Sequence, residues 1–168
     1  EQLGIEEVLQ KVGVEPSGEA FNQISLDKEL NIPKNPMINS GAITTHSLIQ
    51  TTDGISRAEQ LRRFLSELAG RELSFDEQVY TSEMKTAFRN LSIGYMLRTV
   101  GALDTDPVEI VNGYIQQCAI KVTVKDLANI ARVLANGGLH PKTGECLLDR
   151  AVVRQVLSVM LSCGMYDA

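Results

Sequence analysis

A carboxylate and an amide stand at a spacing that could line a binding cleft. Glu83 and Asn90 are seven residues apart within a predicted helix over 81–100, so one face would carry both, ~10 Å apart along the axis. Ala87 and Gly94 continue that face, whereas a solvated face usually carries Lys, Glu or Gln. Such a face could line a polar cleft, although an ordinary solvated helix face is the commoner explanation for a pair of this kind.

Three short patterns resemble the nucleophile motifs of serine hydrolases. In S-x-x-K, one helical turn brings the Lys to the Ser, where it takes the hydroxyl proton. Ser25 with Lys28 and Ser82 with Lys85 satisfy this pattern, and a K-T-G triplet stands at 142–144. We expect none to act. Ser25 lies in a stretch without helical periodicity, Ser82 lies at a predicted helix start, where serine usually caps, and the triplet lies in a Pro/Gly loop.

The elements that must position these residues are almost all helices. Apolar residues recur at helical spacing over most of the chain, and we count six or seven helices with no confident strand. Four helices begin behind N-cap residues, at Ser56, Asp106, Thr123 and Asp149,. Asn35 is predicted to cap another, with Pro36 as its first residue and Gly41 inside it, where a neighbour must approach the backbone closely,. The predicted fold class is mainly α, in one unit.

Composition excludes several functions. The 168 residues carry a net charge of −5, which argues against a nucleic-acid partner. There is no apolar run long enough for a membrane span and no signal-peptide pattern. With only two histidines, 94 positions apart, and three cysteines in no zinc or C-x-x-C pattern, we expect no metal site and free thiols in the cytoplasm. There is no P-loop or dinucleotide fingerprint, so no cofactor is expected.

A series of segments, in order along almost the whole chain, resembles one enzyme family. Residues 35–43 read N-P-M-I-N-S-G-A-I and are similar to the N-P-[MF]-[IV]-N-A-G-A segment of the serine-dependent glutaminases. Five further segments resemble motifs of that family. They are the S-E…R-N helix (82–90), the Y-x-x-x-C segment (114–118), the L-A-N-G-G…T-G-E run (134–145), the S-C-G-M-Y-D end (162–167) and the P-S-G…F-N turn (16–22). Each motif is weak alone, and the series is specific.

The resemblance implies hydrolysis of L-glutamine to L-glutamate and ammonia through an acyl-serine intermediate, without a cofactor. It also implies the helical part of the α/β β-lactamase/transpeptidase-like fold and a homo-oligomer, a dimer or tetramer. The family's nucleophilic S-x-x-K lies N-terminal to the segments seen here, and a K-S-G strand lies C-terminal to them. Residue 1 is Glu. We therefore expect residues 1–168 to be a partial glutaminase domain that does not turn over glutamine by itself.

The family's substrate contacts fall on five positions of this sequence, Asn39, Glu83, Asn90, Tyr114 and Tyr166. Glu83 is the one anion among them, so it is expected to take the α-ammonium group. The amides and phenols can donate to the α-carboxylate, and the resemblance places Tyr166 near the reacting amide, in a proton-transfer role. Without the resemblance, Tyr114 is a packing aromatic, Asn39 a cap or turn residue and Tyr166 a tail residue.

Two other functions stay open at this point. One is a catalytically inactive helical interaction or regulatory module of shared ancestry. The other is a β-lactamase-like serine hydrolase built on one of the S-x-x-K or K-T-G patterns.

Overall fold

A computed structural model describes residues 2–51 and 54–164 of the chain. Within them the chain is mainly helical, as predicted. The elements, in order, are α1 (Ile5–Leu9), α2 (Asn39–Ser47), α3 (Arg57–Ala69), β1 (Ser74–Phe75), α4 (Glu77–Lys85), α5 (Phe88–Thr99), α6 (Pro107–Cys118), β2 (Ile120–Lys121), α7 (Val124–Ala135) and α8 (Arg150–Cys163).

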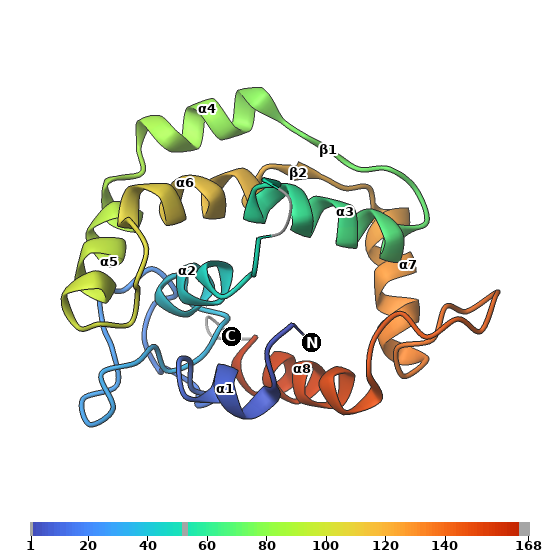
Figure 1. The fold of residues 1–168 in the computed structure, drawn as a ribbon, viewed down its shortest axis with the longest axis horizontal. Helices are drawn as coiled ribbons and strands as arrows, with labels where there is room; N and C mark the ends of the chain where they lie inside the picture. Colours follow the sequence, from blue (N-terminus) through green and yellow to red (C-terminus); the bar gives the residue numbers. More distant parts are fainter. Residues whose placement is uncertain (1, 52–53, 165–168) are drawn as a thin grey trace.

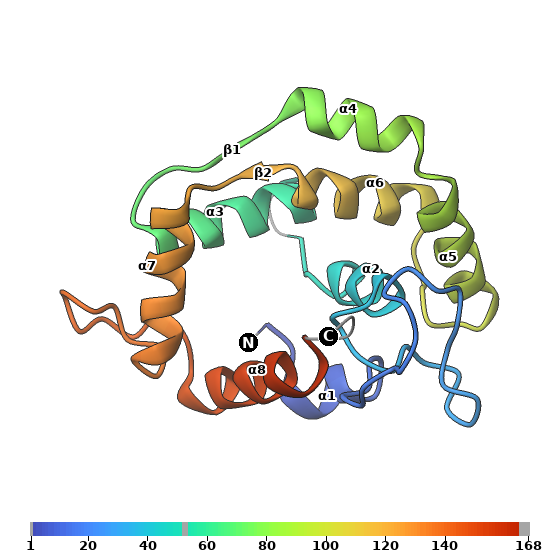
Figure 2. The same ribbon diagram turned by 180° about the vertical axis from the view of Figure 1, so that it is seen from behind.

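The helices form a ring with α2 on its inner side (Figures 1 and 2). Helix α6 contacts α2, α3, α4 and α5, so it is the hub of the arrangement. Strands β1 and β2 pair antiparallel, Ser74 with Lys121 and Phe75 with Ile120. This short ladder ties the segment before α4 to the segment after α6.

The core lies where α2, α5 and α6 meet. Its fully buried aliphatic side chains come from all three helices and from the loop after α5: Ile43, Ile93, Leu97, Leu103, Ile110 and Val111. The predicted close approach at Gly41 is confirmed, because a Cβ there would lie 1.8 Å from the Asn35 carbonyl oxygen. This contact brings the chain before α2 tightly against the helix.

The predicted helix starts at Ser56, Asp106, Thr123 and Asp149 are confirmed, since each side chain accepts a backbone N–H of the following turn. Pro107 is the first residue of α6, where its missing N–H costs nothing. Gly70 ends α3 with φ +73°, a conformation that glycine adopts without strain.

The expectation of one helix over 81–100 is wrong, and the described residues therefore hold eight helices rather than six or seven. Helix α4 ends at Lys85, and α5 begins at Phe88. Between them, Thr86 leaves the helical region (φ −116°, ψ 14°) while Ala87 packs into the core cluster. Because of this turn, Glu83 and Asn90 lie on two helices and not on one face.

The predicted N-cap at Asn35 is also wrong, because α2 begins four residues later, at Asn39. Asn35 is buried and stabilises a turn instead. Its side-chain oxygen accepts the Met37 N–H (2.9 Å) and its side-chain amide donates to the Glu15 carbonyl (2.8 Å). The second bond connects segments 20 residues apart, which local periodicity does not report.

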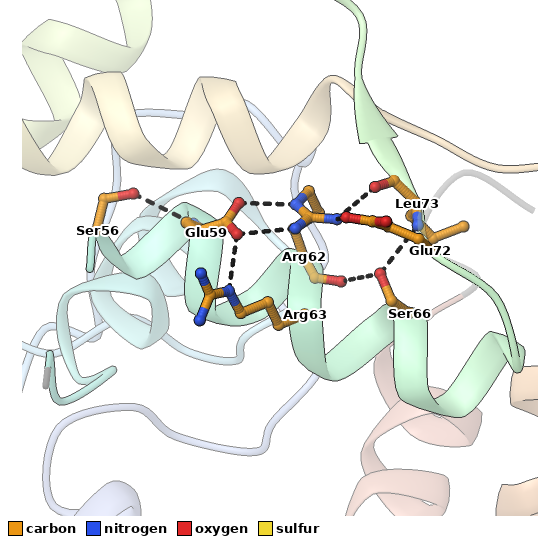
Figure 3. Close-up of polar contacts among 7 residues, drawn as sticks. All are labelled: Ser56, Glu59, Arg62, Arg63, Ser66, Glu72 and Leu73. Atoms are coloured by element: carbon orange, nitrogen blue, oxygen red, sulfur yellow. Dashed lines mark hydrogen bonds and ion pairs between the residues drawn. The ribbon is translucent and has the colours of Figure 1, made fainter. Parts of the chain in front are cut away.

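A polar network on α3 holds the chain that leads into β1 and α4 (Figure 3). The Arg62 guanidinium donates to both Glu59 oxygens (2.7 and 2.8 Å) and to the Leu73 carbonyl, while the Ser66 hydroxyl accepts the Leu73 N–H (3.0 Å). Hydrogen bonds from Arg62, and then from Arg63, lower the pKa of Glu59 to about 2. Through the two bonds to Leu73, the network holds the segment before β1 and α4 against α3.

Candidate functional site

Two of the predicted substrate contacts lie side by side. The Asn39 side-chain Nδ2 donates to the Asn90 Oδ1 at 2.9 Å, and both residues are half-buried. Asn39 is the first residue of α2, and Asn90 lies in the first turn of α5. The packing of α2 against α5 thus unites residues 51 positions apart.

Two more of the predicted contacts influence the pKa of one thiol. On α6, Cys118 lies one turn after Tyr114. Burial raises the pKa of the Cys118 thiol, a hydrogen bond with Tyr114 lowers it, and the charge of Glu83 raises it. Tyr114 is half-buried against the core cluster. Glu83 lies on α4, which packs on α6, and its side chain is exposed.

These four residues lie on α2, α4, α5 and α6, helices that pack on one another around α6. Asn39 and Asn90 hydrogen-bond at the α2–α5 contact, Tyr114 hydrogen-bonds the Cys118 thiol on α6, and Glu83 of α4 acts on that thiol through its charge. The fifth residue, Tyr166, lies outside the described residues. Together the residues carry amides, a phenol and a carboxylate, the donor and acceptor set that an amino acid requires.

The alternative nucleophiles have other structural roles. The Ser25 hydroxyl donates to the Glu19 carboxylate rather than to Lys28. Ser82 is exposed in the middle of α4, so the predicted helix start at this serine is wrong; Asp76 is the N-cap of α4. The K-T-G triplet lies in a turn, as predicted, where the Thr143 hydroxyl contacts the His140 ring at 2.9 Å.

An apolar cleft of about 520 Å³ lies elsewhere, between α2, α3, α7, α8 and the N-terminal segment, and has different chemistry. Aliphatic and aromatic side chains such as Phe64, Ile130, Leu134 and Val156 line it, and no charged side chain does. A zwitterion would lose its hydration there without new partners, so the polar residues of α2, α4, α5 and α6 are the better candidate site.

Within residues 2–51 and 54–164, no group of three or more His, Cys, Asp or Glu side chains could hold a metal ion. Among the described helices, none has the length and apolar character needed to cross a bilayer.

Two buried polar residues near the site were not predicted. Ser40 follows Asn39 and is fully buried, and its hydroxyl makes no hydrogen bond within the described part of the chain. His46 is 2% exposed on α2, and its ring contacts Gln117 of α6. One sequence feature could have indicated a close contact here: Gly113 is a small residue inside α6, and the His46 ring lies against the backbone at this position.

Comparisons with known proteins define the class. The profile of the Glutaminase family matches residues 1–168. Glutaminase from Corynebacterium glutamicum is 52% identical over 99% of this chain, and glutaminase from Clostridium tetani is 45% identical over 98%. The chain belongs to the glutaminase family, which confirms the predicted resemblance.

Solved structures agree over the same span. Mglu in its glutamate form matches with a TM-score of 0.91 at 48% identity over 99% of this chain, and a probable glutaminase from Bacillus subtilis with 0.90 at 37% identity over 97%. They are glutaminases of the β-lactamase-like fold. The chain spans 41% and 55% of the lengths of the two curated relatives and 39% and 53% of these two solved chains.

Proposed function

We propose that the protein containing this chain hydrolyses L-glutamine to L-glutamate and ammonia through an acyl-serine intermediate. The match to the Glutaminase family over residues 1–168 carries this proposal. A related enzyme, Mglu, has been solved in a glutamate form, which supports the amino acid as the ligand class.

Within this proposal the chain supplies most of the substrate pocket. Glu83 takes the α-ammonium group, and Tyr114 and the two asparagines bind the α-carboxylate. Because the Asn90 oxygen accepts from Asn39, Asn90 turns its two N–H donors elsewhere, and these suit a carboxylate. Tyr166 transfers a proton near the reacting amide. Buried polar groups of this kind reject an analogue that leaves them unpaired.

The nucleophile in this proposal comes from outside residues 1–168, which form part of a glutaminase domain. The bond from Ser25 to Glu19 instead of Lys28 supports this assignment, as does the length of the relatives, which exceeds that of this chain about twofold. The chain alone then binds substrate poorly and releases no ammonia.

The test is L-glutamine turnover and binding by the complete protein and its Glu83→Gln variant. Loss of one partly solvated ion pair should raise KM about tenfold, measured by ammonia release and by calorimetry. Glu77→Gln is the matched control, because Glu77 is an exposed carboxylate on the same helix. An unchanged KM in Glu83→Gln, or no turnover by the complete protein, would contradict the proposal.

We further propose a cytoplasmic homo-oligomer, a dimer or a tetramer. Exposed apolar side chains on α7 and α8, Val124 (85%) and Leu161 (84%), support an additional covered surface,. Cys118, Cys146 and Cys163 are free, as suits a reducing compartment. Light scattering of the complete protein measures the mass, and a monomer at working concentration would contradict the oligomer.

A further inference from the structure

Helix α2 is attached to its neighbours by side-chain hydrogen bonds near both ends. At its first residue, Asn39 bonds Asn90 of α5. Two turns later, His46 Nδ1 lies 2.7 Å from Gln117 Oε1 of α6. Gln117 itself follows Tyr114 by three residues, about one turn of the same helix. The His46 contact therefore connects the helix that carries Asn39 with the helix that carries Tyr114.

The surroundings of the His46 ring select one tautomer. A glutamine side-chain oxygen only accepts, so Nδ1 carries the proton in this bond. On the other side of the ring, Nε2 lies against the α6 backbone, since a Cβ at Gly113 would stand 2.4 Å from it. The Gly113 methylene group accepts no hydrogen bond, so a proton on Nε2 gains no partner from it. The neutral Nδ1–H form keeps the Gln117 bond and leaves no proton against this backbone.

The same surroundings oppose a charged ring. Burial lowers the pKa of His46 below its usual value, the Gln117 bond opposes this shift, and the charge of Arg57 lowers the pKa further. Arg57 comes from α3 and is paired with Glu109 of α6 at 2.9 Å. The neutral ring is thus the favoured form at pH 7.

We propose that His46 is a positioning residue, which in its neutral Nδ1–H form sets α2 against α6 and so places Asn39 relative to Tyr114 in the glutamine site. The effect on substrate rests on the proposed function, whereas the tautomer and the helix contact do not. His46 acts through Asn39 and Gln117 and has no place at the reacting atoms.

The first test reads the ring itself and needs no activity. In ¹⁵N–¹H correlation spectra of the complete protein, the His46 ring is identified as the signals that disappear in its His46→Asn variant. We expect His46 to show a protonated Nδ1 and a bare Nε2 at pH 7 and to titrate below the ordinary histidine range. A protonated Nε2, or a cationic ring at pH 7, would overturn the proposal.

The second test reads the substrate site of the complete enzyme. His46→Ala should raise KM for L-glutamine about tenfold while kcat changes less than about twofold, because one buried hydrogen bond is lost away from the reacting atoms. His46→Asn keeps an N–H donor for Gln117 and should recover most of that loss. Equal KM values for His46→Ala and the parent, or no recovery in His46→Asn, would overturn the proposal.

The third test uses the close contact at Gly113. Gly113→Ala places a methyl group against Nε2, so it should raise KM at least as much as His46→Ala. Combining it with His46→Asn, whose shorter side chain leaves that space, should bring KM back to the His46→Asn value. Additive losses in the double variant would overturn the proposed contact. If the complete enzyme does not use glutamine at all, the proposed function fails while the ring spectra still decide the tautomer.

Discussion

The two sides of the helical ring differ in how their side chains are packed and paired. Where α2, α5 and α6 meet, the apolar side chains are buried and several polar ones are paired across helices, as in Asn39–Asn90 and His46–Gln117. Around α3, α7 and α8, an uncharged cleft of about 520 Å³ stays open and Val124 and Leu161 are exposed. The first side holds the core cluster, and the second leaves apolar surface open around an uncharged cleft.

Truncation of a core side chain should change the free energy of unfolding more than any other substitution that tests this difference. Leu97 is fully buried, whereas Leu157 on α8 is 42% exposed. Leu97→Ala should lower the free energy of unfolding by about 2–5 kcal/mol, and Leu157→Ala by less than about 1 kcal/mol. Urea unfolding measures both, and equal losses would show that the two sides are packed alike.

The acid response of the α3 network is expected to be smaller. The pKa of Glu59 is lowered to about 2, so its ionised form stabilises the folded state above the unfolded pKa of about 4.5. That contribution is lost as pH falls from about 4.5 to about 2. Thermal melts over this range should show a steeper decline for the parent than for Glu59→Gln. Parallel curves would contradict the role of this network in holding the chain before β1.

A double-mutant cycle measures the Asn39–Asn90 pair directly. Asn39→Ala, Asn90→Ala and the double variant should give a coupling energy of about 1 kcal/mol, the usual worth of a neutral hydrogen bond. Additive losses of stability would mean that the 2.9 Å contact contributes nothing to joining α2 and α5.

The smallest expected effect has the opposite sign. The Ser40 hydroxyl is buried and makes no hydrogen bond within residues 2–51 and 54–164, which costs free energy. Ser40→Ala introduces the alanine of the similar N-A-G-A pattern. It should therefore raise the free energy of unfolding by up to about 1 kcal/mol, and the melting temperature slightly with it. A clear loss in a calorimetric scan would contradict this reading of Ser40.

The sequence predicted those parts of the fold that depend on near neighbours. Asp106 before Pro107, and Thr123 before its helix, carry their capping information within three residues, so these starts were correct. The break between α4 and α5 was missed because it depends on burial of Ala87 in a core built by distant helices. Asn35 was misassigned for the same reason, since its partner lies 20 residues away.

The candidate site shows the same division. The predicted residues were chosen through a family resemblance, and the structure brings Asn39 to Asn90. The geometric reason first given for Glu83 and Asn90, one shared helix face, was wrong. The contact of His46 with Gln117 spans 71 positions, and no local periodicity reports a pairing of that kind.

Discrimination between L-glutamine and its analogue without the α-amino group, glutaramate, tests the central claim most directly. In the complete protein, Glu83 should make kcat/KM at least about tenfold higher for L-glutamine, because the ion pair exists with that substrate only. Glu83→Gln should bring the ratio close to one. A ratio that the substitution leaves unchanged would contradict the assignment of Glu83 as the group that binds the substrate ammonium.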